Sequence, residues 1–184
     1  MIFRDVEDRD LVVSAQQGNV DAYNTLVSRW EKRVYNYLFR LSGRAEDAFD
    51  LSQESFLKAY QSLPRLEDPS RFGAWLFRIA HNETISLIRK TRPESELNEE
   101  THPPPRQRMA AVEVSLAVET ALAQLSPDQR EAVLLKVHQG FKFEEIAEIL
   151  GCPASTIKSR VYTGLELLKE LLAPVAGGRE DRQK

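Results

Sequence analysis

A proline-rich, acidic stretch interrupts the middle of the 184-residue chain. Residues 93–112 contain four of the nine prolines and almost no large apolar residue before Met109. The run from Pro103 to Pro105 excludes a helix and favours extended polyproline II. We therefore predict a flexible linker over 92–111, which joins a domain at 1–91 to a domain at 112–173, followed by a disordered tail over 174–184.

Apolar residues recur at helical spacing on both sides of this stretch, without sustained alternation of period two. In the first domain the pattern predicts a short helix ending at Gly18, then helices over about 21–41 and 45–63, and a fourth from near Ser70. The second domain begins with a helix through Val118. The fold class is therefore all-α, with two small helical domains, a four-helix bundle and a helix-turn-helix domain.

The second domain shows a helix-turn-helix pattern. Ser126, Pro127 and Gln129 form a capping box that predicts a helix ending at Gly140. A short helix over 143–150, a turn over 151–153 and a longer helix then follow. The small core shared by the last two helices is predicted to consist of Ile146, Ala147, Leu150, Ile157 and Val161.

The second helix of such a pair places its N-terminal part in the DNA major groove. Here that part carries two positive charges, and no acidic residue occurs between Cys152 and Glu166. Hydroxyl and basic side chains can reach phosphates and base edges, whereas the alternative is a helical hairpin that serves only for packing. The predicted DNA contacts are Ser155, Thr156, Lys158, Ser159, Arg160 and Tyr162. Cys152 is expected to be a small buried side chain in the turn.

The first domain contains a second basic segment. Residues 71–92 hold five basic side chains against Glu83 alone, with aromatic residues between them. Such a mixture suits single-stranded nucleic acid, because bases stack on rings while cations meet the backbone. Trp75 shares a helical stripe with Phe72, which favours core packing for the indole. The polar side chains are the better contact candidates, namely Arg78, His81, Asn82 and Ser86.

The third predicted helix carries negative charge. Glu46, Asp50 and Glu54 recur every four residues along one face, with Asp47 and Gln53 beside it. This face is either simply solvated or a docking surface for a basic partner, and the residues alone favour neither reading.

Composition excludes several other classes. A net charge of −3 is unlike that of a protein that coats nucleic acid. A single cysteine and three scattered histidines favour neither a disulfide framework nor a metal site. Catalytic motifs, long apolar spans and a signal peptide are missing from the sequence. We expect a cytoplasmic protein that is not an enzyme and needs no cofactor.

Three segments in order, at 50–63, 70–90 and 125–161, resemble the extracytoplasmic-function group of bacterial sigma-70-type sigma factors. The resemblance implies a promoter-specificity subunit of RNA polymerase, with a region 2-like domain over 1–91 and a region 4-like domain over 112–173. Its implied partners are core polymerase, through the β′ and β subunits, promoter DNA and a cognate anti-sigma factor. The alternative is a helix-turn-helix regulator that is not a polymerase subunit.

The resemblance also implies a role for each candidate residue. The third helix would dock on the clamp helices of β′, through Asp47, Asp50, Gln53 and Glu54. The −10 element would be opened and held by Leu66, Arg71, Phe72, Arg78, His81, Asn82, Ser86 and Arg89. The −35 element would be read by Ser155, Thr156, Lys158, Ser159, Arg160 and Tyr162.

Some positions depart from the family pattern. Lys142 stands where a Ser or Thr cap is usual, which weakens that helix start by about 1 kcal/mol. Thr163, Gly164 and Leu165 follow Tyr162 where many members continue with basic residues, so fewer phosphate contacts are expected.

Overall fold

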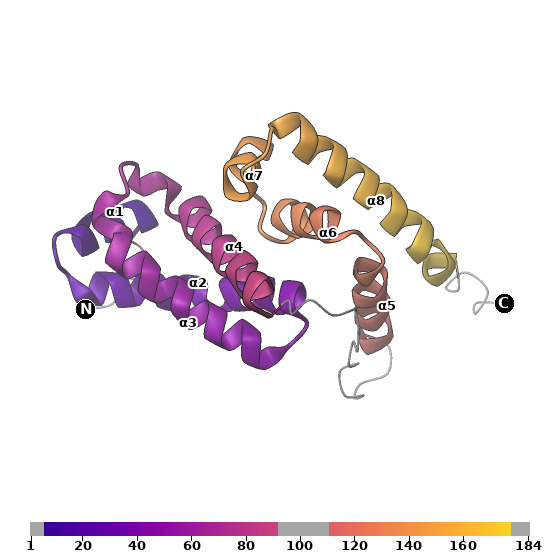
Figure 1. Ribbon diagram of the computed structural model, residues 1–184, viewed down its shortest axis with the longest axis horizontal. Coiled ribbons are helices and arrows are strands. Elements are labelled where there is room, and N and C mark those ends of the chain that lie inside the picture. The colour runs from indigo at the N-terminus through magenta and orange to yellow at the C-terminus, as the bar shows by residue number, and fades with distance from the viewer. Residues whose placement is uncertain (1–5, 92–110, 178–184) are drawn as a thin grey trace. The chain divides into compact units, whose positions relative to one another are not determined.

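The structure, a computed structural model, describes residues 6–91 and 111–177, and all regular elements within these ranges are helical. The chain divides near residue 100 into two compact units (Figure 1). This confirms the all-α fold class. The predicted linker lies outside the described residues, apart from Ala111, with which the first helix of the second unit begins.

The first unit contains the four predicted helices. Helices α2, α3 and α4 pack along one another, and α1 lies against α2 and against the short turns η1 and η2 that connect α3 to α4 (Figure 1). The helices are α1 (Asp8–Gln16), α2 (Val20–Ser42), α3 (Ala45–Ser62) and α4 (Phe72–Thr91), and the 3₁₀ turns are η1 (Leu63–Arg65) and η2 (Pro69–Arg71).

Local sequence signals account for both ends of α2. The Asn19 side chain accepts a hydrogen bond of 3.2 Å from the Ala22 amide, which satisfies one of the free donors at the helix start. At the other end Gly43 adopts a left-handed φ of 71°, and its amide donates to the Phe39 carbonyl at 2.9 Å. Only glycine adopts this conformation at little cost, so the position of the helix end is set by Gly43.

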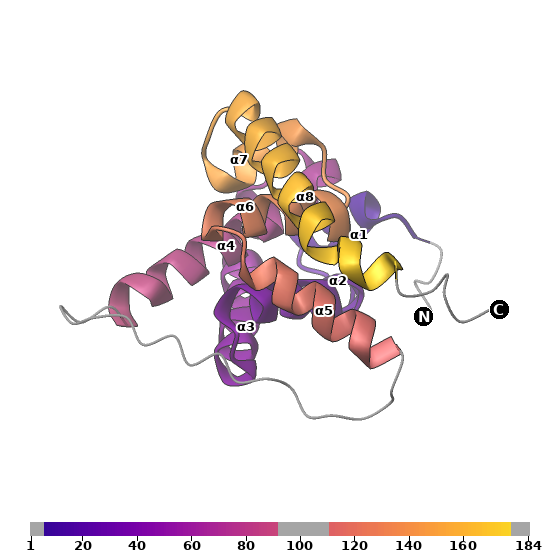
Figure 2. The ribbon, with the colours of Figure 1, turned by 90° about the vertical axis from the view of Figure 1, so that its right-hand side faces the viewer.

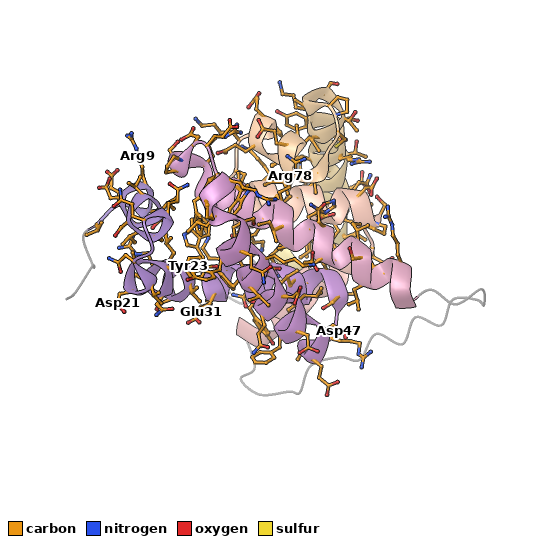
Figure 3. All side chains as sticks on the ribbon, turned by 60° about the vertical axis from the view of Figure 1, so that its left-hand side comes forward. Arg9, Asp21, Tyr23, Glu31, Asp47 and Arg78 are labelled. Atoms are coloured by element: carbon orange, nitrogen blue, oxygen red, sulfur yellow. The ribbon has the colours of Figure 1, made fainter. Side chains whose placement is uncertain are left out.

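Trp30 and Tyr23 tie α2 to its neighbours. The indole N–H of Trp30 donates to Asp8 of α1 at 2.8 Å, and the phenol of Tyr23 donates to the Phe56 carbonyl of α3 at 2.5 Å. Figure 3 shows Tyr23 pointing into the first unit. Burial raises the pKa of Tyr23 far above its ordinary value.

The second unit is built around α8. Helix α8 packs across α5 and α6 (Figure 2). The elements are α5 (Ala111–Ala123), α6 (Pro127–Val133), a π-helical turn η3 (Leu134–His138), α7 (Phe143–Leu150) and α8 (Ala154–Gly177). Helix α8 thus runs four residues into the range predicted as a disordered tail, and 178–184 lie outside the described residues.

Two helix starts in this unit are stabilised by capping. The predicted capping box at α6 is confirmed, because Ser126 Oγ accepts from the Gln129 amide at 3.3 Å and Gln129 Oε1 accepts from the Ser126 amide at 3.2 Å. At α7 the Glu145 carboxylate accepts from the Lys142 amide at 2.7 Å. Half of a capping box therefore forms there although Lys142 lacks a hydroxyl, which offsets part of the predicted weakness.

The predicted core between α7 and α8 is partly confirmed. Ile146, Ile157 and Val161 are buried, whereas Ala147 and Leu150 are only half-buried. Gly164 explains how closely α8 approaches α6, because a Cβ at this position would lie 2.9 Å from Val133 Cγ2. Its lack of a side chain serves packing between the helices.

Candidate functional site

The acidic residues of α3 form an exposed face, and only some of its carboxylates lie near a cation among the described residues. Asp50, Gln53 and Glu54 are exposed, and Asp47 is half-buried at the N-terminal end of the helix, where Figure 3 shows it. Arg44 Nε lies 3.7 Å from Asp47 Oδ2, and Lys58 Nζ lies 3.4 Å from Glu54 Oε1. Asp50 has no charged partner among the described residues, so its carboxylate is the most available for a basic partner.

Apolar side chains lie along this face and were not predicted as functional. Phe49 is 55% exposed and Leu57 is 52% exposed. With Gln53 between them, they recur every four residues and form one stripe beside Asp50. Large exposed apolar side chains grouped in this way are typical of a protein-binding surface. The sequence signal was the position of Phe49 and Leu57 away from the buried stripe of the helix.

Four predicted residues of α4 form a second exposed face. Arg78, Asn82, Ser86 and Arg89 are all exposed, and their spacing places them on one side of the helix. Figure 3 shows Arg78 on α4. Ser86 Oγ donates to the Asn82 carbonyl at 2.8 Å, while the Asn82 amide side chain is exposed. His81 is half-buried at the edge of this stripe, and Arg71 is exposed in η2.

Phe72, which was predicted to contact DNA, is buried in this structure. Phe72 is 1% exposed, and its ring centroid lies 6.1 Å from that of Trp30 and 6.0 Å from that of Trp75. The reason is its register, because Phe72 shares a helical face with the buried Leu76. Leu66 is also buried, so neither apolar side chain is retained as a DNA contact.

The loop that connects α3 to α4 is held by polar contacts. The Gln16 side chain, from α1, donates to the carbonyls of Leu63 at 3.0 Å and Leu66 at 2.8 Å. Further along, Asp68 accepts from the Ser70 hydroxyl at 2.6 Å and from its amide at 3.0 Å, and these bonds hold the pKa of Asp68 below its ordinary value. These contacts join the loop backbone to α1 and cap η2.

Lys58 of α3 forms an ion pair with Glu83, the one acidic residue of the basic segment over 71–92. Lys58 Nζ donates to Glu83 Oε2 at 2.6 Å, and the Glu83 side chain is only 13% exposed. The hydrogen bond raises the pKa of Lys58 above its ordinary value. The exposed face of α4 therefore keeps its positive character.

The predicted DNA-contacting residues of α8 divide into two groups. Ser155, Lys158, Ser159 and Tyr162 are exposed, and their spacing places them on one face. Thr156 and Arg160 are half-buried on the flanks of the helix. The structure therefore brings four of the six predicted residues together.

Arg160 makes contacts inside its own unit. Its Nη2 donates to the Asp128 carboxylate of α6, and its Nη1 lies 3.4 Å from Cys152 Sγ in the turn before α8. Cys152 accepts this bond and is half-buried, so the small side chain in the turn is less buried than predicted.

The half-buried Lys136 and Phe143 lie beside the exposed face of α8. The rings of Phe143 and Tyr162 lie 6.0 Å apart between centroids. Lys136 Nζ lies 4.6 Å from the Phe143 centroid and Lys158 Nζ lies 5.7 Å from it. Two ammonium groups thus gather around one aromatic ring. No sequence signal singled out Lys136 or Phe143, because the cluster forms only when η3, α7 and α8 come together.

Neither a metal centre nor a membrane span is found in residues 6–91 and 111–177. No group of three potential His, Cys, Asp or Glu ligands converges within these ranges, and no described helix is both long and apolar enough to cross a bilayer. The chemistry available on the two units is therefore that of charged, hydroxyl, amide and aromatic surfaces.

Family models match both units. The model for Sigma-70 region 2 matches residues 26–94, and the model for Sigma-70, region 4 matches residues 115–168. The first match covers α3 and α4, and the second covers α6, α7 and the exposed face of α8.

Curated relatives match over nearly their whole length. The ECF RNA polymerase sigma-E factor of Haemophilus influenzae is 34% identical over 183 residues, which cover 91% of this chain and 96% of that protein. The RNA polymerase sigma-H factor of Pseudomonas aeruginosa is 30% identical, with 92% and 95% covered.

Solved structures of similar fold include two complexes. CnrH, in complex with the cytosolic domain of CnrY, superposes with a TM-score of 0.69 at 28% identity, and 91% of this chain and 97% of that chain are covered. The sigma factor RpoE of Bartonella quintana, in complex with the anti-sigma factor NepR, gives a TM-score of 0.68 at 31% identity, with 82% and 96% covered.

Proposed function

Since the chain belongs to the extracytoplasmic-function group of sigma-70-type RNA polymerase sigma factors, we propose that it binds core polymerase and directs initiation at promoters with −35 and −10 elements. The observation that supports this most strongly is the order of two matched regions, each with an exposed polar helix face. The family acts in transcription initiation. That this chain has no catalytic activity and works in the bacterial cytoplasm is part of the proposal.

The α3 face is the proposed docking surface for core polymerase. It combines Asp50, which has no charged partner within 6–91 and 111–177, and the amide of Gln53 with exposed apolar area on Phe49 and Leu57. Basic and apolar groups on the β′ clamp helices would complement this surface, as the family resemblance implies. Glu54 and Asp47 would exchange their internal cation partners, Lys58 and Arg44, for partners on polymerase.

The α4 face is proposed to hold the opened −10 element. Arg78 and Arg89 supply phosphate contacts, and the amide of Asn82 can hydrogen-bond an extruded base. Unstacking a base costs a few kcal/mol, which the binding pocket must offset. Arg71, which is exposed in η2 before α4, and His81, the neighbour of Asn82, would add further contacts.

The exposed face of α8 is proposed to read the −35 element as duplex DNA. Ser155, Ser159 and Tyr162 face the groove, Lys158 adds charge, and Lys136 lies where a phosphate could approach the Phe143 ring. Because the net charge is −3, the free chain should bind DNA poorly and depend on polymerase to hold it at a promoter.

An anti-sigma factor is the proposed regulatory partner, since one similar solved structure is a complex of a sigma factor with an anti-sigma factor. A helix-turn-helix regulator that acts without polymerase would explain α7 and α8 but not the surface of α3. The comparisons favour the sigma-factor function over this alternative.

The docking proposal is tested by titrating core polymerase with Asp50→Lys combined with Glu54→Lys. We expect the affinity to fall at least about a hundredfold, because charge reversal at the centre of an interface costs several kcal/mol. Asp21→Lys with Glu31→Lys is the matched control, since it reverses two exposed acidic residues of α2 that Figure 3 shows away from Asp47. Equal affinity of the α3 variant and the control would contradict the placement.

A further inference from the structure

We propose that Arg160 and Asp128 form a brace that fixes the orientation of α8 on α6, and that Arg160 is a positioning residue for −35 recognition and not a base-reading one. The proposal rests on the proposed function, in which the exposed face of α8 reads DNA. It corrects the assignment of Arg160 from sequence and gives a role to Asp128, which no sequence pattern had suggested.

The contacts of Arg160 join three elements of the second unit. One guanidinium nitrogen donates to Asp128 in the first turn of α6, and the other donates to the Cys152 thiol in the turn before α8. The Arg160 side chain is 28% exposed. An arginine that is already bonded on two sides would have to break these contacts before it could bind a guanine through both nitrogens.

The helical register places Arg160 away from the exposed face. Arg160 lies three residues after Ile157 and four before Gly164, both of which are buried against the rest of the unit. At 3.6 residues per turn Tyr162 lies nearly opposite Arg160 around the helix, and the exposed Ser155 and Ser159 lie between the two. Arg160 thus points along the surface of α6 while the other side chains point outward.

Gly164 and Arg160 fix α8 in complementary ways. The Cβ-free surface of Gly164 lets α8 approach Val133 of α6 closely, which sets the distance between the helices. The ion pair lies one turn nearer the N-terminus and limits rotation of α8 at that distance. A rotation of α8 would move every side chain of its exposed face relative to the DNA major groove. The Arg160–Asp128 pair can therefore contribute little to the free energy of folding and still contribute strongly to DNA affinity.

Two possible roles of Asp128 predict opposite effects of Asp128→Asn on DNA affinity. If Asp128 merely lies near DNA, neutralising it removes a repulsive charge and binding strengthens. If Asp128 holds Arg160 in a brace, the amide loses the charge-assisted bond and binding weakens. The sign of the change therefore separates the brace from a simple electrostatic effect.

The experiment uses holoenzyme and a duplex that carries the −35 element but ends upstream of the −10 element. The element is taken from a promoter mapped by sequencing transcript starts after overexpression of the chain. We expect Asp128→Asn and Arg160→Ala each to lower the affinity about fivefold. The double variant should bind no more weakly than Arg160→Ala alone, because both changes remove one contact.

Thermal melting tests whether a variant has lost fold stability, and the salt dependence of affinity tests whether it has lost a phosphate contact. We expect the melting temperature of Asp128→Asn to stay within the error of the wild type, and Arg160→Ala to leave the slope of log affinity against log salt unchanged. Affinity of Asp128→Asn equal to or above wild type, additive losses in the double variant, or a reduced salt slope for Arg160→Ala would each overturn the brace.

Lys158→Ala serves as the reference for the proposed function. It should reduce the salt slope by about 1, because Lys158 is exposed and contacts phosphate in the proposal. An unchanged affinity for Lys158→Ala would count against −35 reading by this face of α8. The comparison of Asp128→Asn with Arg160→Ala decides the brace separately.

Discussion

The helices proposed to face DNA, α4 and α8, share two packing features but differ in the sign of the charged side chain that is paired with a neighbouring helix. Each packs on its neighbour through a glycine, with Gly73 of α4 against Trp30 and Gly164 of α8 against Val133. Each also has one charged side chain held by a neighbouring helix. In α4 the held group is the acidic Glu83, bound by Lys58, whereas in α8 it is a basic one, Arg160.

The difference indicates how each unit would bind nucleic acid. Neutralising Glu83 leaves the exposed arginines of α4 without an opposing charge on the same helix, which suits a flexible strand that is held mainly through its backbone. Holding Arg160 removes half of the positive charge near the start of α8. Recognition there depends more on hydroxyl groups, Tyr162 and the exact orientation of the helix, which suits rigid duplex DNA.

The largest expected effect comes from Gly73→Ala. The added Cβ would lie 2.4 Å from the Trp30 ring, and that indole is fixed by its bond to Asp8. Because a buried ring cannot move aside freely, we expect a loss of about 1 to 3 kcal/mol in the free energy of unfolding of the first unit. Urea denaturation followed by tryptophan fluorescence measures the loss. A midpoint at or above that of the wild type would contradict the close packing.

The next effect concerns Lys58→Met. This change leaves Glu83 with little solvent and without its cation, and we expect a loss of about 1 kcal/mol after allowing for the exposure of Lys58. Promoter opening should fall as well, since α4 regains a negative charge. The matched control is Lys58→Arg, which keeps the cation. Equal denaturation midpoints for both variants would show that Glu83 needs no partner.

A pH experiment separates the two units. The pKa of Tyr23 is raised by burial above its ordinary value of 10.0, so the native state resists deprotonation. The stabilisation is complete below the unfolded-state pKa, and the first unit should lose stability as the pH rises above about 10. Tyr23→Phe should flatten this loss. Urea midpoints at several alkaline pH values measure it, and parallel curves for both proteins would contradict the assignment to Tyr23.

The smallest effect is expected for Gly164→Ala. The new methyl group would meet only Val133 Cγ2 below 3.0 Å, and alanine favours a helix by about 1 kcal/mol over glycine. The two contributions nearly cancel, so we expect a change within about 1 kcal/mol. Thermal melting of the second unit checks this. A loss as large as that of Gly73→Ala would remove the difference between the two glycine contacts.

The sequence predicted features that depend on near neighbours in the chain. The helix end at Gly18, the end of the next helix near residue 41 and the capping box at Ser126 were predicted correctly, because a few adjacent residues determine them. Arg78, Asn82 and Ser86 were selected from the sequence as polar contact candidates, and all three are exposed on α4. The burial of Phe72 agrees with its spacing to Leu76, which places both side chains on one helical stripe.

Contacts between distant residues could not be predicted in this way. Gln16 bonds to backbone carbonyls that lie 47 and 50 residues away, and Asp128 pairs with Arg160 across 32 residues. Such contacts depend on how the helices pack, which a single sequence does not specify. They also hold the loop before α4 and the orientation of α8, so the least predictable contacts support the proposed nucleic-acid surfaces.

The most direct test of the contrast between α4 and α8 is permanganate reactivity of promoter thymines bound by holoenzyme with Asn82→Ala. If α4 holds the opened strand while α8 reads duplex, this variant should still protect the −35 element, and thymines in the −10 element should lose most of their reactivity. Thymine reactivity equal to that of the wild type would contradict the assignment of the opened strand to α4.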